Sequence, residues 1–156
     1  MKQLIILSGA DRVGKSTLAS KMKKAGVCRV IHHGPPPADR PLFSDLRDDI
    51  ADWLNSDDPQ MCWDRAYVCS YCLEQPNVMD AILRLEMDMI GFKVKHIGVW
   101  APWQAVAQRH LDEMEELCVS NPVSEYRLRL ETHKRYYERL HDFYANVTRF
   151  PHEWAT

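Results

Sequence analysis

The sequence predicts a three-layer α/β fold in which a parallel five-stranded sheet is covered by helices on both faces. Apolar runs of strand length alternate along the chain with segments whose apolar residues recur at helical spacing, an order typical of a parallel sheet. The chain has 156 residues, of which 46% are hydrophobic and 27% charged. This length and composition indicate a single domain over residues 1–156 with one sizeable core.

The first strand is predicted over the apolar run at residues 4–7, and the first helix over residues 16–25, ending at Gly26. A second strand is expected over residues 27–31. The loop that follows, residues 32–37, ends in three prolines, which cannot continue a strand or enter a helix interior. In open α/β sheets, ligands bind at the edge where such loops leave the strands.

Helical spacing of apolar residues predicts the next helix over residues 42–54. A short apolar strand over residues 61–63 ends at Asp64 and Arg65. A further helix is expected over residues 77–90.

The fourth strand is predicted over residues 93–100, and Pro102 is suited to open the helix after it. Asn121 and Pro122 form a second start signal, for a long helix over residues 123–144. The last strand is expected over residues 147–150, and a short lid over residues 109–121.

A phosphate-binding pattern, G-x-x-x-x-G-K-[ST], lies between the first strand and the first helix. Its residues are Gly9, Ala10, Asp11, Arg12, Val13, Gly14, Lys15, Ser16 and Thr17. The order strand, glycine loop, helix is the context in which this pattern, known as Walker A, binds nucleotides. The alternative, a glycine turn that binds nothing, explains neither Lys15 nor Ser16. The sequence therefore predicts a site for a nucleoside triphosphate.

The residue types in the loop suit ATP and Mg²⁺. Glycine at positions 9 and 14 lets main-chain N–H groups turn toward a phosphate, and the helix N-terminus adds its own N–H groups and dipole. Lys15 is expected to reach the β- and γ-phosphates, and the Ser16 hydroxyl to coordinate Mg²⁺.

Charged residues at the predicted carboxyl edge are candidates for catalysis. Asp64 is expected to hold the metal or, if the acceptor is a hydroxyl, to accept its proton. Arg65 offers a planar donor fork for an acceptor phosphate. Inside the loop, Arg12 is a candidate for the positive charge on the transferred phosphoryl group, with Asp11 beside it. The alternative for each is a solvated surface charge.

Two further residues are candidates for the acceptor side. Arg109 is placed to approach the phosphates from the lid, although pairing with the acidic run at residues 112–116 is an equal alternative. His33, or its neighbour His32, is a candidate to face the pocket, and a core or loop histidine is the alternative.

Composition excludes several classes of protein. The net charge of −2 gives no global basic field for nucleic acid, and no apolar run has the length of a membrane span. Without a signal-peptide pattern at its start, the chain is expected in the cytoplasm. Five scattered cysteines indicate reduced thiols, and the role of Cys69 and Cys72, a lone C-x-x-C, stays open.

These motifs resemble those of thymidylate kinases that keep an arginine in the phosphate loop. Asp11-Arg12-x-Gly14-Lys15-Ser16-Thr17 resembles their loop, and Trp63-Asp64-Arg65 resembles their Asp-Arg-Tyr motif. The resemblance implies a P-loop kinase fold and ATP with Mg²⁺. It also implies that Arg12 acts on the transferred phosphoryl group, that Asp11 and Arg65 lie near the acceptor, and that Asp64 lies near the metal or the acceptor. Together with the loop motif, this makes Arg12, Lys15, Asp11 and Asp64 the catalytic candidates, and Ser16 and Asp64 the candidates for the metal.

The chain departs from these kinases in its shorter length and in lacking the Asn-Arg segment that helps hold thymine. Compact bacteriophage kinases of this general type phosphorylate 5-hydroxymethyluracil within DNA. The preferred hypothesis is therefore a kinase for that hydroxymethyl group, acting in the host cytoplasm if the chain is viral. The missing basic surplus weighs against a DNA acceptor.

Two alternatives remain at this point. One is a deoxynucleoside monophosphate kinase, whose acceptor is already an anion and needs arginines more than a base. The other is a P-loop protein that binds nucleotide without catalysis. The sequence is compatible with a dimer but does not fix the oligomeric state.

Overall fold

The computed structural model describes residues 1–26, 29–36 and 38–155. In the described chain, five parallel strands form one sheet in the order β2-β3-β1-β4-β5. The strands are β1 (Gln3–Ser8), β2 (Arg29–His32), β3 (Gln60–Asp64), β4 (Lys93–Val99) and β5 (His152–Ala155). The helices are α1 (Lys15–Lys24), α2 (Ser44–Leu54), α3 (Tyr67–Cys72), α4 (Val78–Asp88), α5 (Trp103–Glu116) and α6 (Pro122–Asp142), with a π-helical turn, η1 (Phe143–Val147), after α6.

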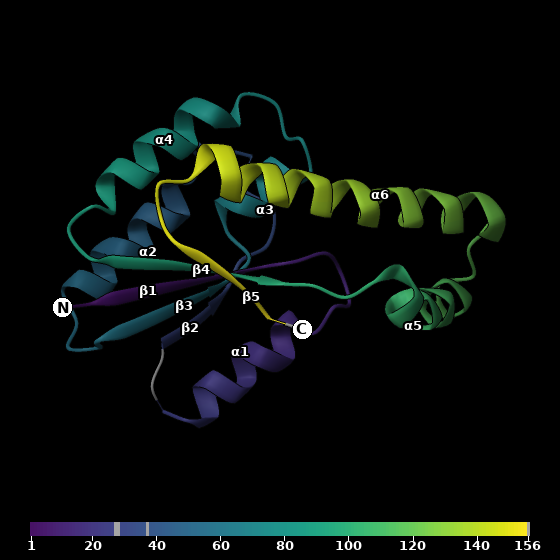
Figure 1. Cartoon of the computed structure of the whole chain (residues 1–156), viewed down its shortest axis with the longest axis horizontal. Coiled ribbons are helices and arrows are strands. Elements are labelled where there is room, and N and C mark those ends of the chain that lie inside the picture. Colours follow the sequence, from purple (N-terminus) through teal and green to yellow (C-terminus); the bar gives the residue numbers. More distant parts are fainter. Residues whose placement is uncertain (27–28, 37, 156) are drawn as a thin grey trace.

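Alternating side chains of the central strand β1 separate two apolar layers. Leu4 and Ile6 belong to the larger core, which α2, α3, α4 and α6 complete. Ile5 and Leu7 belong to a smaller cluster with Ala19 of α1. Figure 1 shows α1 on one face of the sheet, and α2, α3, α4 and α6 on the opposite face. The predicted three-layer fold with helices on both faces is confirmed.

Most of the predicted elements are present, with shifted ends. The N-cap at Asn121 is confirmed, because its side-chain Oδ1 accepts a hydrogen bond of 3.2 Å from the main-chain N–H of Ser124. The predicted strand at residues 27–31 corresponds to β2, and its residues 27 and 28 lie outside the described chain. The short helix α3 was not predicted, because five of its six residues are buried and no amphipathic period marks it.

The predicted last strand at residues 147–150 is wrong. Residues 143–147 instead extend α6 by the π-helical turn, in which Phe143 and Tyr144 are buried. Pairing with β4 begins where the N–H of His96 donates to the carbonyl of Pro151, and the strand is β5. Since β5 is an edge strand with two exposed polar residues at its start, its sequence lacks the apolar run of a central strand.

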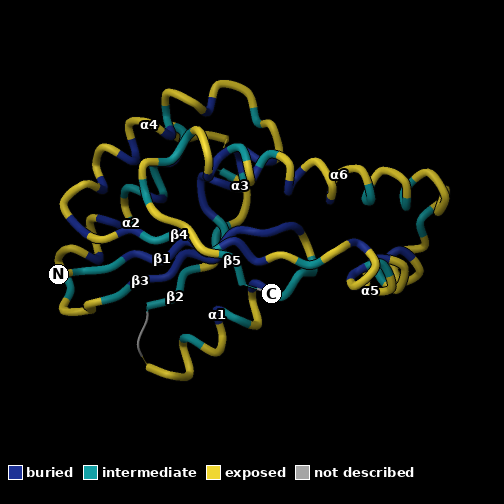
Figure 2. The backbone as a smooth tube through the Cα atoms, viewed as in Figure 1, coloured by how far each residue is buried: buried dark blue, intermediate teal, exposed yellow. Residues whose placement is uncertain are grey.

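Helices α5 and α6 form a hairpin that reaches beyond the sheet (Figure 1). The second half of α6 packs on the larger core through Tyr136, Tyr137 and Leu140. Figure 2 shows that the far end of the hairpin is mostly exposed. Among the described residues, no helix combines the length and apolar character needed to cross a bilayer.

A buried polar network joins α3, α4, β4 and the segment before β5. Glu86 is fully buried, and its carboxylate accepts hydrogen bonds from Tyr67 (2.9 Å) and Thr148 (2.8 Å). Because the Thr148 hydroxyl donates its hydrogen bond to Glu86, its oxygen acts as the acceptor for His96, whose Nε2–H donates to it at 3.1 Å. Burial, with a contribution from His152, lowers the pKa of His96 to about 3.

This pKa predicts a loss of stability in mild acid. His96 is neutral in the folded chain, whereas in the unfolded chain it takes up a proton below its ordinary pKa of 6.5. Its contribution is therefore fully present above pH 6.5 and declines as the pH falls toward 3. At pH 5 the free energy of unfolding should be lower by about 2 kcal/mol from this residue.

Urea unfolding at pH 7.5, 6 and 5 measures this decline. His96→Gln keeps an N–H donor near Nε2 but cannot titrate. Its free energy of unfolding should therefore fall by about 2 kcal/mol less than that of the wild type between pH 7.5 and pH 5, whatever value the variant has at pH 7.5. An unchanged pH dependence in His96→Gln would contradict the assignment.

Candidate functional site

The phosphate loop lies between β1 and α1, and its backbone requires glycine at two positions. A Cβ on Gly9 would lie 2.5 Å from the carbonyl oxygen of Val99 on the neighbouring strand. Gly14 has φ +103°, in the region that favours glycine. Arg12 also adopts a positive φ, 65°, although it carries a side chain. Such strained positions persist where the surroundings fix them, and they cluster at functional sites.

Two adjacent tyrosines of α6 fix the start of the loop. The N–H of Gly9 donates to the hydroxyl of Tyr136 at 3.1 Å, and the N–H of Ala10 donates to the hydroxyl of Tyr137 at 3.3 Å. The Tyr137 hydroxyl in turn donates to the carbonyl of Val99 at 2.7 Å. Sequence reasoning gave these tyrosines no role, because no local pattern connects them to a loop more than a hundred residues away.

A cavity of about 330 Å³ opens at the start of α1. Its lining residues are Arg12, Gly14, Lys15, Ser16, Thr17, Arg65 and Arg109. Lys15 is buried, and its Nζ donates to the carbonyl of Ala10 at 2.9 Å. Burial, together with the charge of Arg65, lowers the pKa of Lys15. Because four cationic side chains line it, those of Arg12, Lys15, Arg65 and Arg109, the cavity has the charge that a polyphosphate site requires.

Asp64 lies beside this cavity at the end of β3. Its Oδ2 accepts a hydrogen bond of 3.1 Å from the Ser16 hydroxyl and lies 2.7 Å from Nδ1 of His32. Its Oδ1 is buried without a hydrogen-bond partner among the described residues.

The donor set near Asp64 fits Mg²⁺. A carboxylate with one unpartnered buried oxygen next to a serine hydroxyl suits a cation that takes one or two protein ligands and completes its shell with phosphates and water. The described residues contain no cluster of three acidic, histidine or cysteine side chains that would hold a metal by themselves.

A second cavity, of about 320 Å³, lies between the phosphate loop, α3 and the α5–α6 hairpin. Its lining residues are Gly9, Ala10, Asp11, Arg12, Arg65, Cys69, Leu73, His110, Glu113, Glu125, Leu128, Arg129, Thr132, His133 and Tyr136. Within the described chain, Arg12 and Arg65 are the residues that line both cavities. The two guanidinium groups therefore stand at the boundary between two spaces of similar size.

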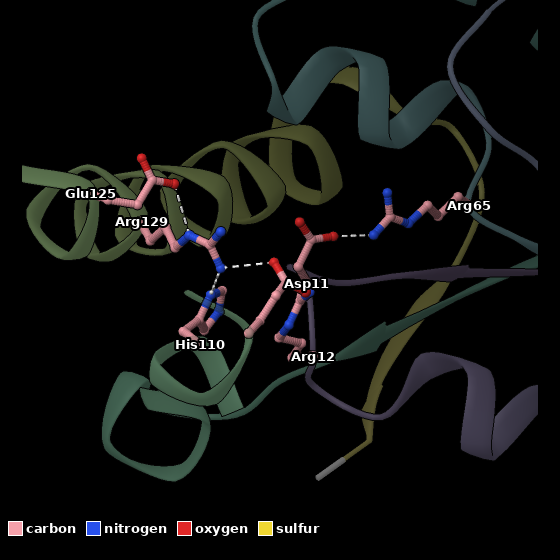
Figure 3. A network of polar contacts seen from close by, with 7 residues as sticks. Asp11, Arg12, Arg65, His110, Glu125 and Arg129 are labelled. Carbon is pink, nitrogen blue, oxygen red and sulfur yellow. Dashed lines mark hydrogen bonds and ion pairs between the residues drawn. The ribbon is translucent and has the colours of Figure 1, made fainter. Parts of the chain in front are cut away.

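The arginines at this boundary are each paired with a carboxylate. Arg65 forms an ion pair with Asp11, and like Arg12 it has a positive φ, 67°. Burial raises the pKa of Asp11, but the charges of Arg65, Lys15 and Arg12 outweigh it, so the pKa lies below its ordinary value of 3.8. Asp11 is therefore ionised at neutral pH. Figure 3 shows Asp11 and Arg65 facing each other across the loop.

The hairpin supplies the opposite wall. Glu113 of α5 forms ion pairs with Arg12 and, at 3.0 Å, with Arg129 of α6. Arg129 also donates to Glu125 at 2.9 Å and to Nδ1 of His110 at 3.3 Å (Figure 3). Burial and the charges of Arg12 and Arg129 lower the pKa of His110, which agrees with a neutral ring that accepts this bond. None of these hairpin residues was singled out from the sequence as a cavity residue.

Two candidate acceptor residues lie elsewhere than expected. Arg109 lines the cationic cavity, and its Nη1 donates to the main-chain carbonyl of Arg12 at 2.7 Å. This contact comes from α5, and it lies on the side of Lys15 and Ser16.

His33 does not line either cavity. Its ring lies beside Asp45 (3.5 Å) and Asp49 (2.8 Å) of α2 and against the edge of Trp63. His32, at the end of β2, is the histidine that reaches the site, through Asp64. The alternation of side chains along a strand explains the difference, because neighbouring residues point to opposite faces.

The two cysteines of the C-x-x-C pattern have different surroundings. Cys69 lines the second cavity, where burial raises the pKa of its thiol against the charges of Arg65 and Lys15. Cys72 is buried, and burial likewise raises its pKa. Within the described part of the chain neither forms a disulfide.

Solved structures share this fold, although the sequence matches no protein-family model and no curated protein. The Bacillus subtilis YorR protein, in complex with phosphorylated GDP, matches with a TM-score of 0.66 at 18% identity over 97% of this chain and 84% of its own. Polyphosphate kinase 2 from Arthrobacter aurescens matches with a TM-score of 0.68 at 13% identity, over 99% of this chain and 61% of its own.

Deoxyadenosine kinase from M. mycoides with bound dATP matches with a TM-score of 0.51 at 14% identity, over 99% of this chain and 90% of its own. At such low identities the comparisons concern the fold alone. They show that this chain has the five-stranded parallel α/β fold found in P-loop kinases.

The tyrosine anchors generate a prediction about the loop. Tyr137→Phe removes the hydroxyl that accepts from Ala10 and donates to Val99, so the Ala10 amide should exchange with solvent faster. The free energy of unfolding should fall by about 1–2 kcal/mol. Hydrogen exchange followed by NMR measures the first effect, with the amide of Ile6 in the sheet as the internal control. Unchanged exchange at Ala10 would show that Tyr137 does not hold the loop.

Proposed function

We propose that the chain is an ATP- and Mg²⁺-dependent kinase that transfers the γ-phosphate to a deoxynucleotide-type acceptor. The observation that carries this proposal is the meeting of two cavities at Arg12 and Arg65. Phosphoryl transfer needs a donor and an acceptor held on either side of the group in flight, with positive charge at the point of transfer. The two shared arginines supply that charge.

On the donor side, the cationic cavity would hold the triphosphate. The main-chain N–H groups of the loop and the N-terminus of α1 would bind the β-phosphate, and Lys15 would reach the γ-phosphate by leaving the carbonyl of Ala10. Ser16 and Asp64 would hold Mg²⁺, which neutralises charge on the phosphate oxygens. Arg109 would add its charge from α5.

On the acceptor side, the geometry favours a nucleoside monophosphate. The second cavity has the volume of a small-molecule site, which typically measures roughly 300–1,000 Å³. Arg65 and Arg12 at its mouth suit an acceptor phosphate, because guanidinium groups bind phosphates bidentately. In this reaction an oxygen of the acceptor phosphate forms a bond to the γ-phosphorus of ATP. The bond between the γ-phosphorus and the oxygen that bridges it to the β-phosphate breaks, and ADP leaves. The acceptor needs no base, since its oxygen is already an anion.

The positions of the carboxylates favour this acceptor over a hydroxyl. Asp64, the base expected from the sequence, does not line the second cavity and contacts Ser16 instead. We therefore propose the metal as its role.

A second candidate, the hydroxymethyl group of 5-hydroxymethyluracil in DNA, rests on Asp11. This ionised carboxylate faces the second cavity and could take the proton of a hydroxyl acceptor. The 5-hydroxymethyluracil nucleobase would have to flip out of the DNA helix to enter a cavity that lies between the loop and the hairpin. The monophosphate acceptor needs neither step and is preferred.

The names of the structural neighbours agree with a nucleotide acceptor or donor. YorR holds phosphorylated GDP, and the deoxyadenosine kinase holds dATP. Polyphosphate kinase 2 acts, by its name, on a polyphosphate, so the fold alone does not set the acceptor.

An acceptor panel tests the proposal. The chain is incubated with γ-labelled ATP and Mg²⁺ together with each of the four deoxynucleoside monophosphates or, separately, duplex DNA containing 5-hydroxymethyluracil. We expect label in a diphosphate and none in DNA. Lys15→Ala, which removes the ammonium beside Ala10, should abolish the transfer. Label only in DNA would replace the monophosphate by the second candidate, and ATP binding without any transfer would overturn the proposed kinase activity.

The role proposed for Asp64 predicts a metal-dependent defect. Asp64→Asn keeps the side-chain shape but removes the charge, so the Mg²⁺ concentration that gives half-maximal transfer should rise by about 10- to 100-fold, because the ligand is lost rather than the base. Titration of Mg²⁺ at saturating ATP measures this shift. His33→Asn, outside both cavities, is the control and should leave the midpoint unchanged. A large fall in turnover that excess Mg²⁺ does not restore would point to a role for Asp64 as base.

A further inference from the structure

Arg12 is held from α5 at two points, by residues one helical turn apart on that helix. Arg109 donates to the main-chain carbonyl of Arg12 at 2.7 Å, and Glu113 forms an ion pair with its side chain. Both the backbone and the charged end of Arg12 are therefore fixed by one helix. This agrees with the positive φ of Arg12, which needs such support.

Glu113 is itself fixed by a second arginine. One of its carboxylate oxygens accepts from Nη1 of Arg129 at 3.0 Å, while the other pairs with Arg12. Arg129 is held in turn by Glu125 of its own helix at 2.9 Å and is largely buried. The chain of contacts thus runs from the phosphate loop through α5 to α6, and each charge in it has a partner of opposite sign.

We infer that Glu113 is a positioning residue for the phosphoryl transfer, and this rests on the proposed function. It holds the guanidinium of Arg12 at the boundary of the two cavities, where the γ-phosphoryl group would pass. A guanidinium has five N–H donors, so the contact with Glu113 leaves other N–H groups for the phosphoryl oxygens. The charge of Glu113 does not repel those oxygens strongly, because Arg129 and Arg12 offset it.

The same contacts make the hairpin part of the active site. Helix α5 holds the side chain of Arg12 through Glu113 and carries Arg109, which lines the cationic cavity. The position of the hairpin therefore sets where the guanidinium groups of Arg12 and Arg109 lie. A mobile arginine on a loop would have to be ordered at each turnover. A guanidinium fixed beforehand by a carboxylate avoids that entropy cost.

Steady-state kinetics of Glu113→Gln test the inference. The substitution keeps the shape of the side chain and removes the charge that holds Arg12. We expect kcat to fall by about 10- to 100-fold, the usual effect of losing a group that orients a catalytic residue. The KM for ATP should change by less than about threefold, because Lys15 and the loop amides bind most of the triphosphate. Glu116→Gln, an exposed change on the same helix, is the matched control and should behave as wild type.

A double-mutant cycle separates positioning from a merely structural role. In the Arg12→Ala background, Glu113→Gln should cause no further fall in kcat, because its target is gone. Single-turnover transfer of label at excess enzyme follows the residual rates. The same fold loss in both backgrounds would overturn the inference, as would an unchanged or raised kcat in Glu113→Gln.

A second measurement does not depend on turnover. In arginine-labelled protein at low temperature, the guanidinium Nη–H NMR signals that disappear in Arg12→Ala belong to Arg12. The Nη–H signal on the nitrogen that faces Glu113 should be slow to exchange with water in the wild type and fast in Glu113→Gln. A signal that is equally fast in both proteins would overturn the inference alone. A wild-type chain that transfers no phosphate would overturn the proposed function and, with it, the role assigned to Glu113.

Discussion

The start of the phosphate loop depends on the hydroxyl groups of two neighbouring tyrosines. Buried main-chain N–H groups without hydrogen-bond partners are costly. Tyr136 and Tyr137 satisfy those of Gly9 and Ala10, and Tyr137 joins the loop to Val99 at the end of β4. The long helix α6 therefore fixes the start of the loop against the end of β4.

Charge pairing is the second constraint on the site. Arginines gathered close together repel one another, and each of those around the second cavity has a carboxylate beside it: Asp11 for Arg65, and Glu113 for Arg12 and Arg129. These pairs keep the cationic groups in place before any ligand arrives. They also connect the loop to the hairpin, so the two cavities and the hairpin form one electrostatic unit.

The positions of Asp64 and His33 show how the contacts of a side chain bear on the role expected from its residue type. Asp64 ends β3 with its carboxylate toward Ser16 and His32, so its contacts favour the metal side of the site. His33 lies one residue after the end of β2 and turns toward the carboxylates of α2. The residue types alone left both the base role of Asp64 and the pocket role of His33 open. The structure shows which groups each side chain contacts, Ser16 and His32 for Asp64 and the carboxylates of α2 for His33.

The local order of the chain was enough to predict the layers, the phosphate loop and most helices, because the period of apolar residues and the loop chemistry are local properties. The cap at Asn121 is of the same kind. The short buried helix α3 and the polar edge strand β5 lack such a period and were missed.

Only the tertiary structure decided which distant side chains meet. The contacts of Tyr136, Tyr137 and Glu113 with the loop join residues more than a hundred positions apart, and Glu113 meets Arg129 across the two helices of the hairpin. Such pairs leave no trace in local spacing, since they depend on how α6 packs on the sheet. The sequence by itself determined the order of strand, glycine loop and helix that predicts a phosphate site after the first strand. The packing of α5 and α6 determined which charges surround it.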